Sequence, residues 1–224
     1  MKKDNKKIGE NHTKEEGKYV YCVIPNNGKS VSFSNCGLGN PDEVYTIPYK
    51  DISAVVNDTP LTEYQPSEEN IKIHNEVVNR VMKECTLIPM AFGMAFKDKN
   101  VLLSVLEKSY DAIKKTLELL ENKVELGLKI ILSKELMEQL DDERKNQLSN
   151  YVFESIKKNA VESANGKLFS ERLLLNASFL VEKDKVEEFS KEIDKIEKML
   201  APKIQYTGPW PPYNFVKINI GKGE

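Results

Sequence analysis

The sequence predicts an α+β protein of two domains, and three observations support that prediction. Its 224 residues give room for one large domain or two small ones, since domains of about 100–150 residues are commonest. Apolar residues make up 40% and charged residues 30%, a balance typical of globular chains rather than of disordered or membrane-spanning ones. Short β-branched and aromatic runs occur among amphipathic helical stretches along the chain.

The first residues have a different composition from the rest of the chain. Residues 1–16 carry nine charges and one sizeable apolar side chain, Ile8, which favours a disordered tail. They contain no apolar stretch of the kind found in a secretory signal. Order is expected to begin with a strand over 18–24, which Pro25 ends.

The segment from 17 to 123 is expected to form an N-terminal α+β domain. Residues 44–48 and 52–56 predict a β-hairpin, and Ser67 predicts the start of a helix because its hydroxyl precedes two acidic residues. The apolar run 87–96 contains a proline and a glycine, which favours an extended segment near the core. Asp98 predicts the cap of a further helix ending near 121. Apolar residues recur along that helix at Leu102, Leu106, Ile113, Leu117 and Leu120.

The segment from 124 to 224 is expected to form a second domain. Its expected elements are strand 126–132, a helix opened by Ser133 and continuing to Ile156, a weak strand over 160–164, strand 172–181, a helix capped by Asp184, strand 204–207 and one more strand over 215–220. The βαββαβ order within this series predicts a modified ferredoxin-like layer. The boundary near 123 follows from this pattern alone.

Charge and cysteine usage narrow the class of protein. Lys and Arg total 33 against 35 Asp and Glu, and the formal net charge of −2 argues against a general nucleic-acid binder. No apolar run approaches the 18–20 residues that a membrane span needs. The three cysteines are irregularly spaced, which indicates reduced thiols rather than a disulfide or zinc framework. We therefore expect a cytoplasmic chain without nucleic-acid or membrane partners.

The chain offers little for catalysis. Its two histidines, His12 and His74, lie in the tail and on a helix, and neither belongs to a recognisable catalytic motif. The carboxylates cluster on charged helix faces, where solvation explains them. The sequence therefore predicts no catalytic residue, no metal site and no cofactor.

The most unusual stretch lies between 206 and 215. Its aromatic residues are Tyr206, Trp210, Tyr213 and Phe215, and Trp210 is the only tryptophan of the chain. Its backbone is set by Gly208, Pro209, Pro211 and Pro212. Three prolines in four positions remove amide donors and fix φ, so we expect the segment to leave the sheet in an extended conformation.

Three uses of this aromatic segment stay open at the level of sequence. It packs as a stiff lid on the protein's own core, or it presents Trp210 to a partner, since rigid aromatic side chains bind at low entropic cost. A PxxP ligand, formed by Pro209 and Pro212, is disfavoured because strand candidates on both sides hold the segment in place.

The same segment carries a family resemblance. Residues 206–216, YTGPWPPYNFV, resemble the C-terminal signature of the gas vesicle protein GvpF/GvpL family. The stretches 19–24, 74–96 and 174–181 are similar to three further family motifs in the same order. The resemblance covers about 18–217.

The resemblance implies two α+β domains, the second of them ferredoxin-like, and a non-enzymatic role in gas vesicle formation. It implies a minor shell component or assembly factor, located in the cytoplasm or the gas vesicle, that binds the major shell protein GvpA and other accessory proteins. The expected docking surface comprises Tyr206, Trp210, Tyr213 and Phe215 with the neighbouring strand edges. The alternatives are a scaffold that contacts several accessory proteins and a ferredoxin-like sensor or enzyme, which would show a pocket with convergent polar groups.

Overall fold

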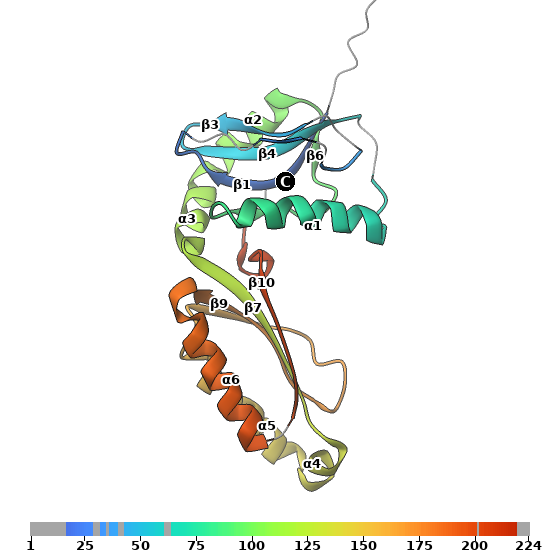
Figure 1. Ribbon diagram of the computed structural model, residues 1–224, viewed down its shortest axis with the longest axis vertical. Helices are drawn as coiled ribbons and strands as arrows, with labels where there is room; N and C mark the ends of the chain where they lie inside the picture. The colour runs from blue at the N-terminus through green and yellow to red at the C-terminus, as the bar shows by residue number, and fades with distance from the viewer. Residues whose placement is uncertain are drawn as a thin grey trace, which may run out of the picture.

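The computed structural model describes residues 17–28, 32–34, 36–39, 43–60, 64–200 and 202–218. The expected tail over 1–16 lies outside these residues. The molecule is elongated, with one antiparallel sheet and its helices at each end of the long axis (Figure 1). The described residues form three hydrophobic clusters, of which two cover opposite faces of the first sheet and the third lies on the second sheet.

The first sheet has the strand order β2-β3-β4-β1-β5, and β6 also pairs with β1. Its strands are β1 (Gly17–Pro25), β2 (Ser32–Ser34), β3 (Glu43–Tyr49), β4 (Ile52–Thr59), β5 (Ile88–Pro89) and β6 (Ala95–Phe96). The expected hairpin is confirmed as β3–β4, and the expected extended run over 87–96 contributes β5 and β6. β1 and β4 are buried on both faces, which explains their nearly continuous apolar sequence.

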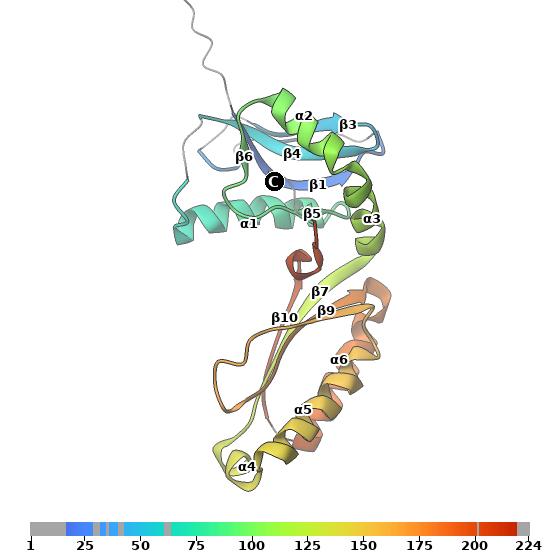
Figure 2. The ribbon, with the colours of Figure 1, turned by 180° about the vertical axis from the view of Figure 1, so that it is seen from behind.

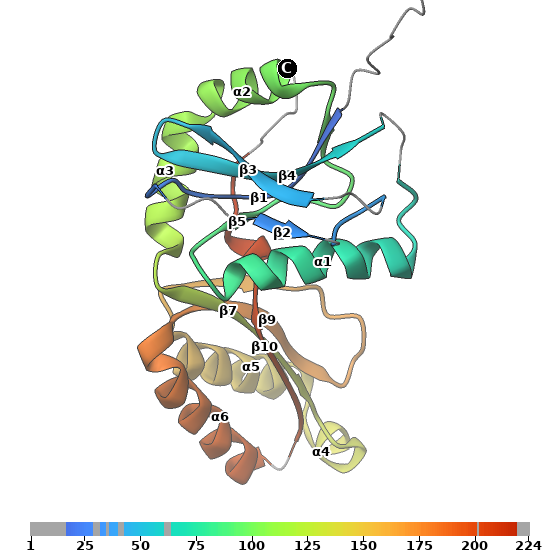
Figure 3. The ribbon, with the colours of Figure 1, turned by 45° about the horizontal axis from the view of Figure 1, so that its top comes forward.

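Three helices cover this sheet from both sides (Figure 3). They are α1 (Glu68–Met82), α2 (Lys99–Lys108) and α3 (Tyr110–Leu120). α1 packs on the face that carries Tyr19, Tyr21 and Val55, whereas α2 and α3 pack on the face that carries Val20 and Val56. Both faces of the first sheet are therefore packed against helices in the described part of the chain.

Two expected helix caps of the first half are confirmed. The Ser67 hydroxyl accepts a hydrogen bond from the Asn70 backbone N–H, and the Asp98 carboxylate accepts one from the Val101 N–H. The single helix expected after Asp98 is wrong, because it divides at Ser109 into α2 and α3. Ser109 has left the helical region, and the Tyr110 ring of α3 packs on Tyr49 at the end of the sheet. Without a Gly or Pro, the helical pattern gave no sign of this break.

The second sheet has the strand order β10-β7-β9-β8. Its strands are β7 (Lys123–Ile131), β8 (Glu162–Asn165), β9 (Leu173–Glu182) and β10 (Lys203–Trp210). The helices of this half are α4 (Lys134–Gln139), α5 (Asp142–Lys157) and α6 (Val186–Leu200), with short 3₁₀ turns η1 (Lys183–Lys185) and η2 (Tyr213–Phe215). α5 and α6 lie on one face of the sheet, and none of the described helices covers the opposite face (Figure 1). We call this opposite face, which carries Glu125, Gly127, Lys129, Ser178 and Thr207, the open face.

Several expectations for the second half need correction. Ser133 caps only the short α4, and Asp141 caps α5 after a break at 140–141, so one long helix is wrong. Asp184 lies inside η1 rather than at the start of α6. The weak strand expected over 160–164 is confirmed as β8.

The end of the chain also differs from expectation. The strand expected over 204–207 is confirmed and extends to Trp210, so Pro209 lies inside β10. β10 is an edge strand, where a proline costs no ladder hydrogen bond if its nitrogen faces outward. The chain leaves the sheet only at Pro211. The strand expected over 215–220 is wrong for residues 215–218, because Phe215 is the last residue of η2 and 216–218 follow it without regular structure. Residues 219–220 lie outside the described residues.

Candidate functional site

The aromatic segment crosses from the second sheet to the first. After β10 the buried residues Pro211 and Pro212 direct the chain to η2, which lies between the two sheets (Figure 2). Phe215 is only 1% exposed and packs in the cluster that contains Val20 of β1 and Leu180 of β9. The segment therefore does pack on the protein's own core, and Phe215 belongs to that core rather than to an exposed surface.

A buried carboxylate fixes the segment to the second sheet. Glu125 is 5% exposed, and its Oε2 accepts a hydrogen bond of 3.0 Å from the backbone N–H of Asn214. The Asn214 side-chain amide donates to the other carboxylate oxygen and, at 3.1 Å, to the Ser178 hydroxyl. Because buried charge is costly without such donors, Glu125 and Asn214 form a structural clamp.

A buried histidine fixes the same segment to the first half. His74 Nε2 lies 3.2 Å from the Met90 carbonyl oxygen, and Nδ1 lies 2.9 Å from the Tyr19 hydroxyl. A carbonyl only accepts, so Nε2 carries the proton and Nδ1 accepts from Tyr19, while the Tyr213 hydroxyl approaches Nε2 at 3.3 Å. Burial lowers the pKa of His74 to about 4 and raises that of Tyr19 to about 12. The imidazole is thus a neutral structural group at pH 7.

Two of the expected docking residues lie at the surface on opposite faces of β10. Tyr206 is 39% exposed, and its ring stacks on Phe189 of α6 with centroids 6.2 Å apart. Trp210 is 46% exposed and lies opposite Glu125 on the open face. A register irregularity between Thr207 and Trp210 brings the tryptophan to that face. Tyr213 is 38% exposed as well, although its hydroxyl points inward to His74.

The open face carries a shallow depression of about 250 Å³ beside Trp210. Its polar lining includes Glu125, Lys129, Asn176, Ser178, Gln205 and Thr207. Gly127 also lines it, and a Cβ there would lie 2.7 Å from the Thr207 hydroxyl. The rim and floor therefore combine one exposed aromatic ring with hydroxyl, amide and ammonium groups.

The backbone conformation of the aromatic segment requires a glycine at position 208. Its φ is +120°, and a Cβ at this position would lie 2.8 Å from the Glu125 carbonyl oxygen. We expect Gly208→Ala to lower the free energy of unfolding by about 2 kcal/mol, measured by urea denaturation. The matched control is Gly28→Ala, because Gly28 also has positive φ but has open space around it. Equal losses in the two variants would contradict a role for the Glu125 contact.

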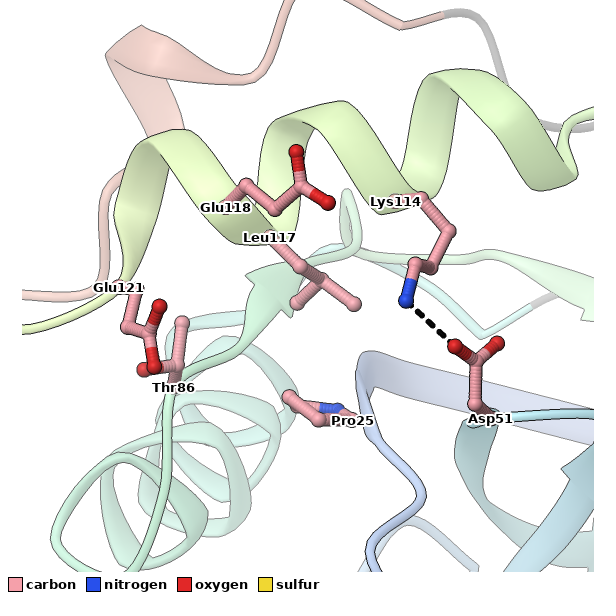
Figure 4. Close-up of a pocket in the computed structure, with 7 residues that line it drawn as sticks. All are labelled: Pro25, Asp51, Thr86, Lys114, Leu117, Glu118 and Glu121. Carbon is pink, nitrogen blue, oxygen red and sulfur yellow. Dashed lines mark hydrogen bonds and ion pairs between the residues drawn. The ribbon is translucent and has the colours of Figure 1, made fainter.

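Two further depressions lie away from this segment. One of about 180 Å³ lies between the first sheet and α3, where the Lys114 ammonium pairs with the Asp51 carboxylate beside Glu118 and Glu121 (Figure 4). The hydrogen bond from Lys114 lowers the pKa of Asp51. The other, of about 540 Å³, lies between α5 and the loop that carries Leu168 and Phe169. In the described part of the chain, no group of His, Cys, Asp and Glu side chains is arranged to hold a metal ion.

Similarity to known proteins extends over nearly the whole described chain. The family model described as "Gas vesicle synthesis protein GvpL/GvpF" matches residues 17–145 and 132–217. The chain belongs to the GvpL/GvpF family. It is 36% identical to gas vesicle protein F1 of Halobacterium salinarum over 210 residues, which cover 92% of this chain and 95% of that protein. It is also 36% identical to gas vesicle protein F of Haloferax mediterranei, covering 92% and 96% of the two chains.

Solved GvpF structures share this fold. The crystal structure of GvpF from Anabaena matches with a TM-score of 0.78 at 19% identity, covering 91% of this chain and 99% of that one. GvpF from Microcystis aeruginosa matches with a TM-score of 0.75 at 20% identity, covering 90% and 99%. The mixed architecture with two antiparallel sheets is therefore shared with these GvpF structures. None of the helices described in this family member is long and apolar enough to span a membrane.

Sequence reasoning singled out the aromatic segment but missed the groups that hold it. Glu125 was available as a signal, because it is the one acidic residue in the strand sequence KVELGLKII. His74 was noted only as a helix residue, and its contacts to Tyr19 and Tyr213 span 55 and 139 positions along the chain. Such contacts leave no local pattern.

Proposed function

We propose that this protein is an accessory protein of gas vesicle formation, acting as an assembly factor or minor shell component that binds the major shell protein GvpA. Membership of the GvpL/GvpF family is the observation that supports a role in gas vesicle formation. Other gas vesicle accessory proteins are further partners within this proposal. The action is binding without catalysis, in the cytoplasm and on the gas vesicle.

The proposal includes the organisation of the chain. We divide it into an N-terminal α+β domain over 17–123 and a ferredoxin-like domain over 124–224. The βαββαβ series of the second half and its strand order β10-β7-β9-β8 support this division. The C-terminal segment then joins the two domains, because Phe215 packs in the first core and Asn214 binds Glu125 of the second sheet.

The docking surface that we propose is centred on Trp210. A partly exposed tryptophan on a well-defined strand presents apolar area with little loss of side-chain entropy on binding. Tyr206 extends this surface to the other side of β10. Phe215 supports it from within, because its burial fixes the path of the chain after Trp210.

Co-purification tests the proposal. Tagged protein expressed with the complete gas vesicle gene cluster is expected to retain GvpA, and Trp210→Ala is expected to reduce the retained amount about tenfold. The matched control is Tyr151→Ala, which removes an aromatic ring that is 59% exposed on α5. Equal retention by both variants would exclude Trp210 as an anchor. Intact, buoyant vesicles in normal numbers after deletion of the gene would contradict the proposed role itself.

A further inference from the structure

β10 is the longest open strand edge among the described residues. It pairs with β7 only, and no backbone hydrogen bond joins 203–210 to any other described segment. The edge strands of the first sheet are only two or three residues long. β8 is four residues long, and the Lys217 ammonium lies 3.0 Å from the Glu162 carboxylate on it. Among the described edge strands, β10 is therefore the one with an eight-residue edge, along which alternate residues point their backbone groups away from β7.

The protection of this edge against pairing is incomplete. Natural edge strands are blunted by lysines, prolines and bulges. β10 has Lys203 at its start, and Pro209 with a register irregularity near its end. Between them, residues 204–207 carry none of these features. This leaves a window of regular strand, which an extended backbone fits because it supplies the complementary row of donors and acceptors.

The side chains around the window define the chemistry of a matching strand. Tyr206 lies within the window on the helix-covered face, so apolar residues at alternate positions of an added strand would pack on the same face as its ring. The residues between them would point to the open face, which carries Trp210. The cationic groups nearby are the ammonium groups of Lys203 and Lys129, neither of which forms an ion pair within the described residues. The Lys129 ammonium lies 5.4 Å from the centre of the Phe169 ring, which does not neutralise its charge. The Glu125 carboxylate is already bound by Asn214. The edge is therefore cationic as well as aromatic.

We propose that β10 accepts an extended strand from a partner protein, a strand with alternating apolar residues and a carboxylate that faces Lys129 or Lys203. Charge complementarity selects this occupant over a second copy of the same chain, since self-pairing would bring two cationic edges together. The inference rests on the proposed function, under which the strand comes from the shell protein GvpA. It identifies the mode of binding as strand addition.

Amide hydrogen exchange tests the mode of binding. The co-purified complex with GvpA is compared with the lone protein, and exchange of the amides within 204–207 that face away from β7 is expected to slow about tenfold or more on binding. A complex in which these amides exchange as fast as in the lone protein would overturn strand addition while leaving the proposed function intact. Failure to form any complex would overturn both. A lone protein that is dimeric with these amides already protected would show that a second copy occupies the edge, and would also overturn the proposal.

Charge reversal tests the chemistry of the strand. The double variant Lys129→Glu/Lys203→Glu is expected to bind GvpA about fivefold more weakly, because it replaces attraction to a carboxylate by repulsion. The matched control is the double variant Lys108→Glu/Lys115→Glu, which makes the same change of net charge at exposed lysines of α2 and α3 in the other half of the molecule. Unchanged binding in a double variant that keeps the wild-type melting temperature would overturn the assignment of an acidic strand.

Discussion

Replacing Phe215 with alanine is expected to lower the free energy of unfolding by about 4 kcal/mol. The ring is 1% exposed and lies among buried aliphatic side chains from both halves of the molecule, including Val20 and Leu180. Its removal loses the transfer free energy of a large apolar group and leaves a cavity that the surrounding strands cannot close. The loss should be large because Phe215 is the point at which the C-terminal segment enters the first core.

Urea denaturation of the full chain measures this effect, with Phe169→Ala as the matched control. Phe169 is 73% exposed in the loop before β9, so the same substitution there is expected to cost less than about 0.5 kcal/mol. A loss of similar size in the two variants would contradict the assignment of Phe215 to the core. Faster amide exchange confined to 211–218 would show that the segment detaches locally rather than unfolding the whole molecule.

Local signals in the sequence were sufficient for much of the fold. The caps at Ser67 and Asp98 could be predicted because a short polar side chain before an amphipathic run satisfies the free N–H groups at a helix start. The hairpin β3–β4 could be predicted because two short strand patterns are separated by a few turn residues. These features depend on neighbours within a few positions in the chain.

The helix breaks could not be predicted in this way. Ser109 and the residues at 140–141 interrupt apolar patterns that continue on both sides at helical spacing, without glycine or proline. The breaks adapt the helices to the sheets on which they pack, as the contact of Tyr110 with Tyr49 shows. The positions at which these helices end are therefore set by tertiary packing rather than by local helix propensity.

The sequence could locate the candidate surface along the chain, but it could not show which side chains of that segment are exposed. Composition drew attention to 206–215, but the face that each aromatic residue occupies depends on the register between β10 and β7. The irregularity after Thr207 places Trp210 on the open face, and a strictly alternating strand pattern does not contain that information. Phe215 looked equivalent to the other aromatic residues, although only its burial distinguishes a core anchor from a docking residue.

His74 is expected to make the stability of the protein fall as the pH is lowered from about 6.5 to about 4. Burial lowers its pKa from the ordinary 6.5 to about 4, because the imidazolium would lose hydration and faces no carboxylate among its described contacts. In this window the unfolded chain takes up a proton at His74 that the folded protein does not. The contribution is therefore complete above pH 6.5 and lost by about pH 4, and it amounts to about 3 kcal/mol.

Comparison with His74→Gln isolates this contribution from that of the carboxylates, which titrate in both proteins. The hydroxyls of Tyr19 and Tyr213 contact the imidazole, and the ring of Tyr21 lies beside it. Burial raises the pKa of all three tyrosines, so they stay protonated throughout the window. Urea denaturation is measured at pH 7.5, which lies about one unit above the window, and at pH 5.5 and 4.5, which lie within it. As the pH is lowered, the free energy of unfolding of the wild type should fall more than that of the variant. The same pH dependence in both proteins would mean that the imidazole takes up its proton in the folded protein with an ordinary pKa. The contact between Tyr213 and His74 would then not depend on a neutral ring.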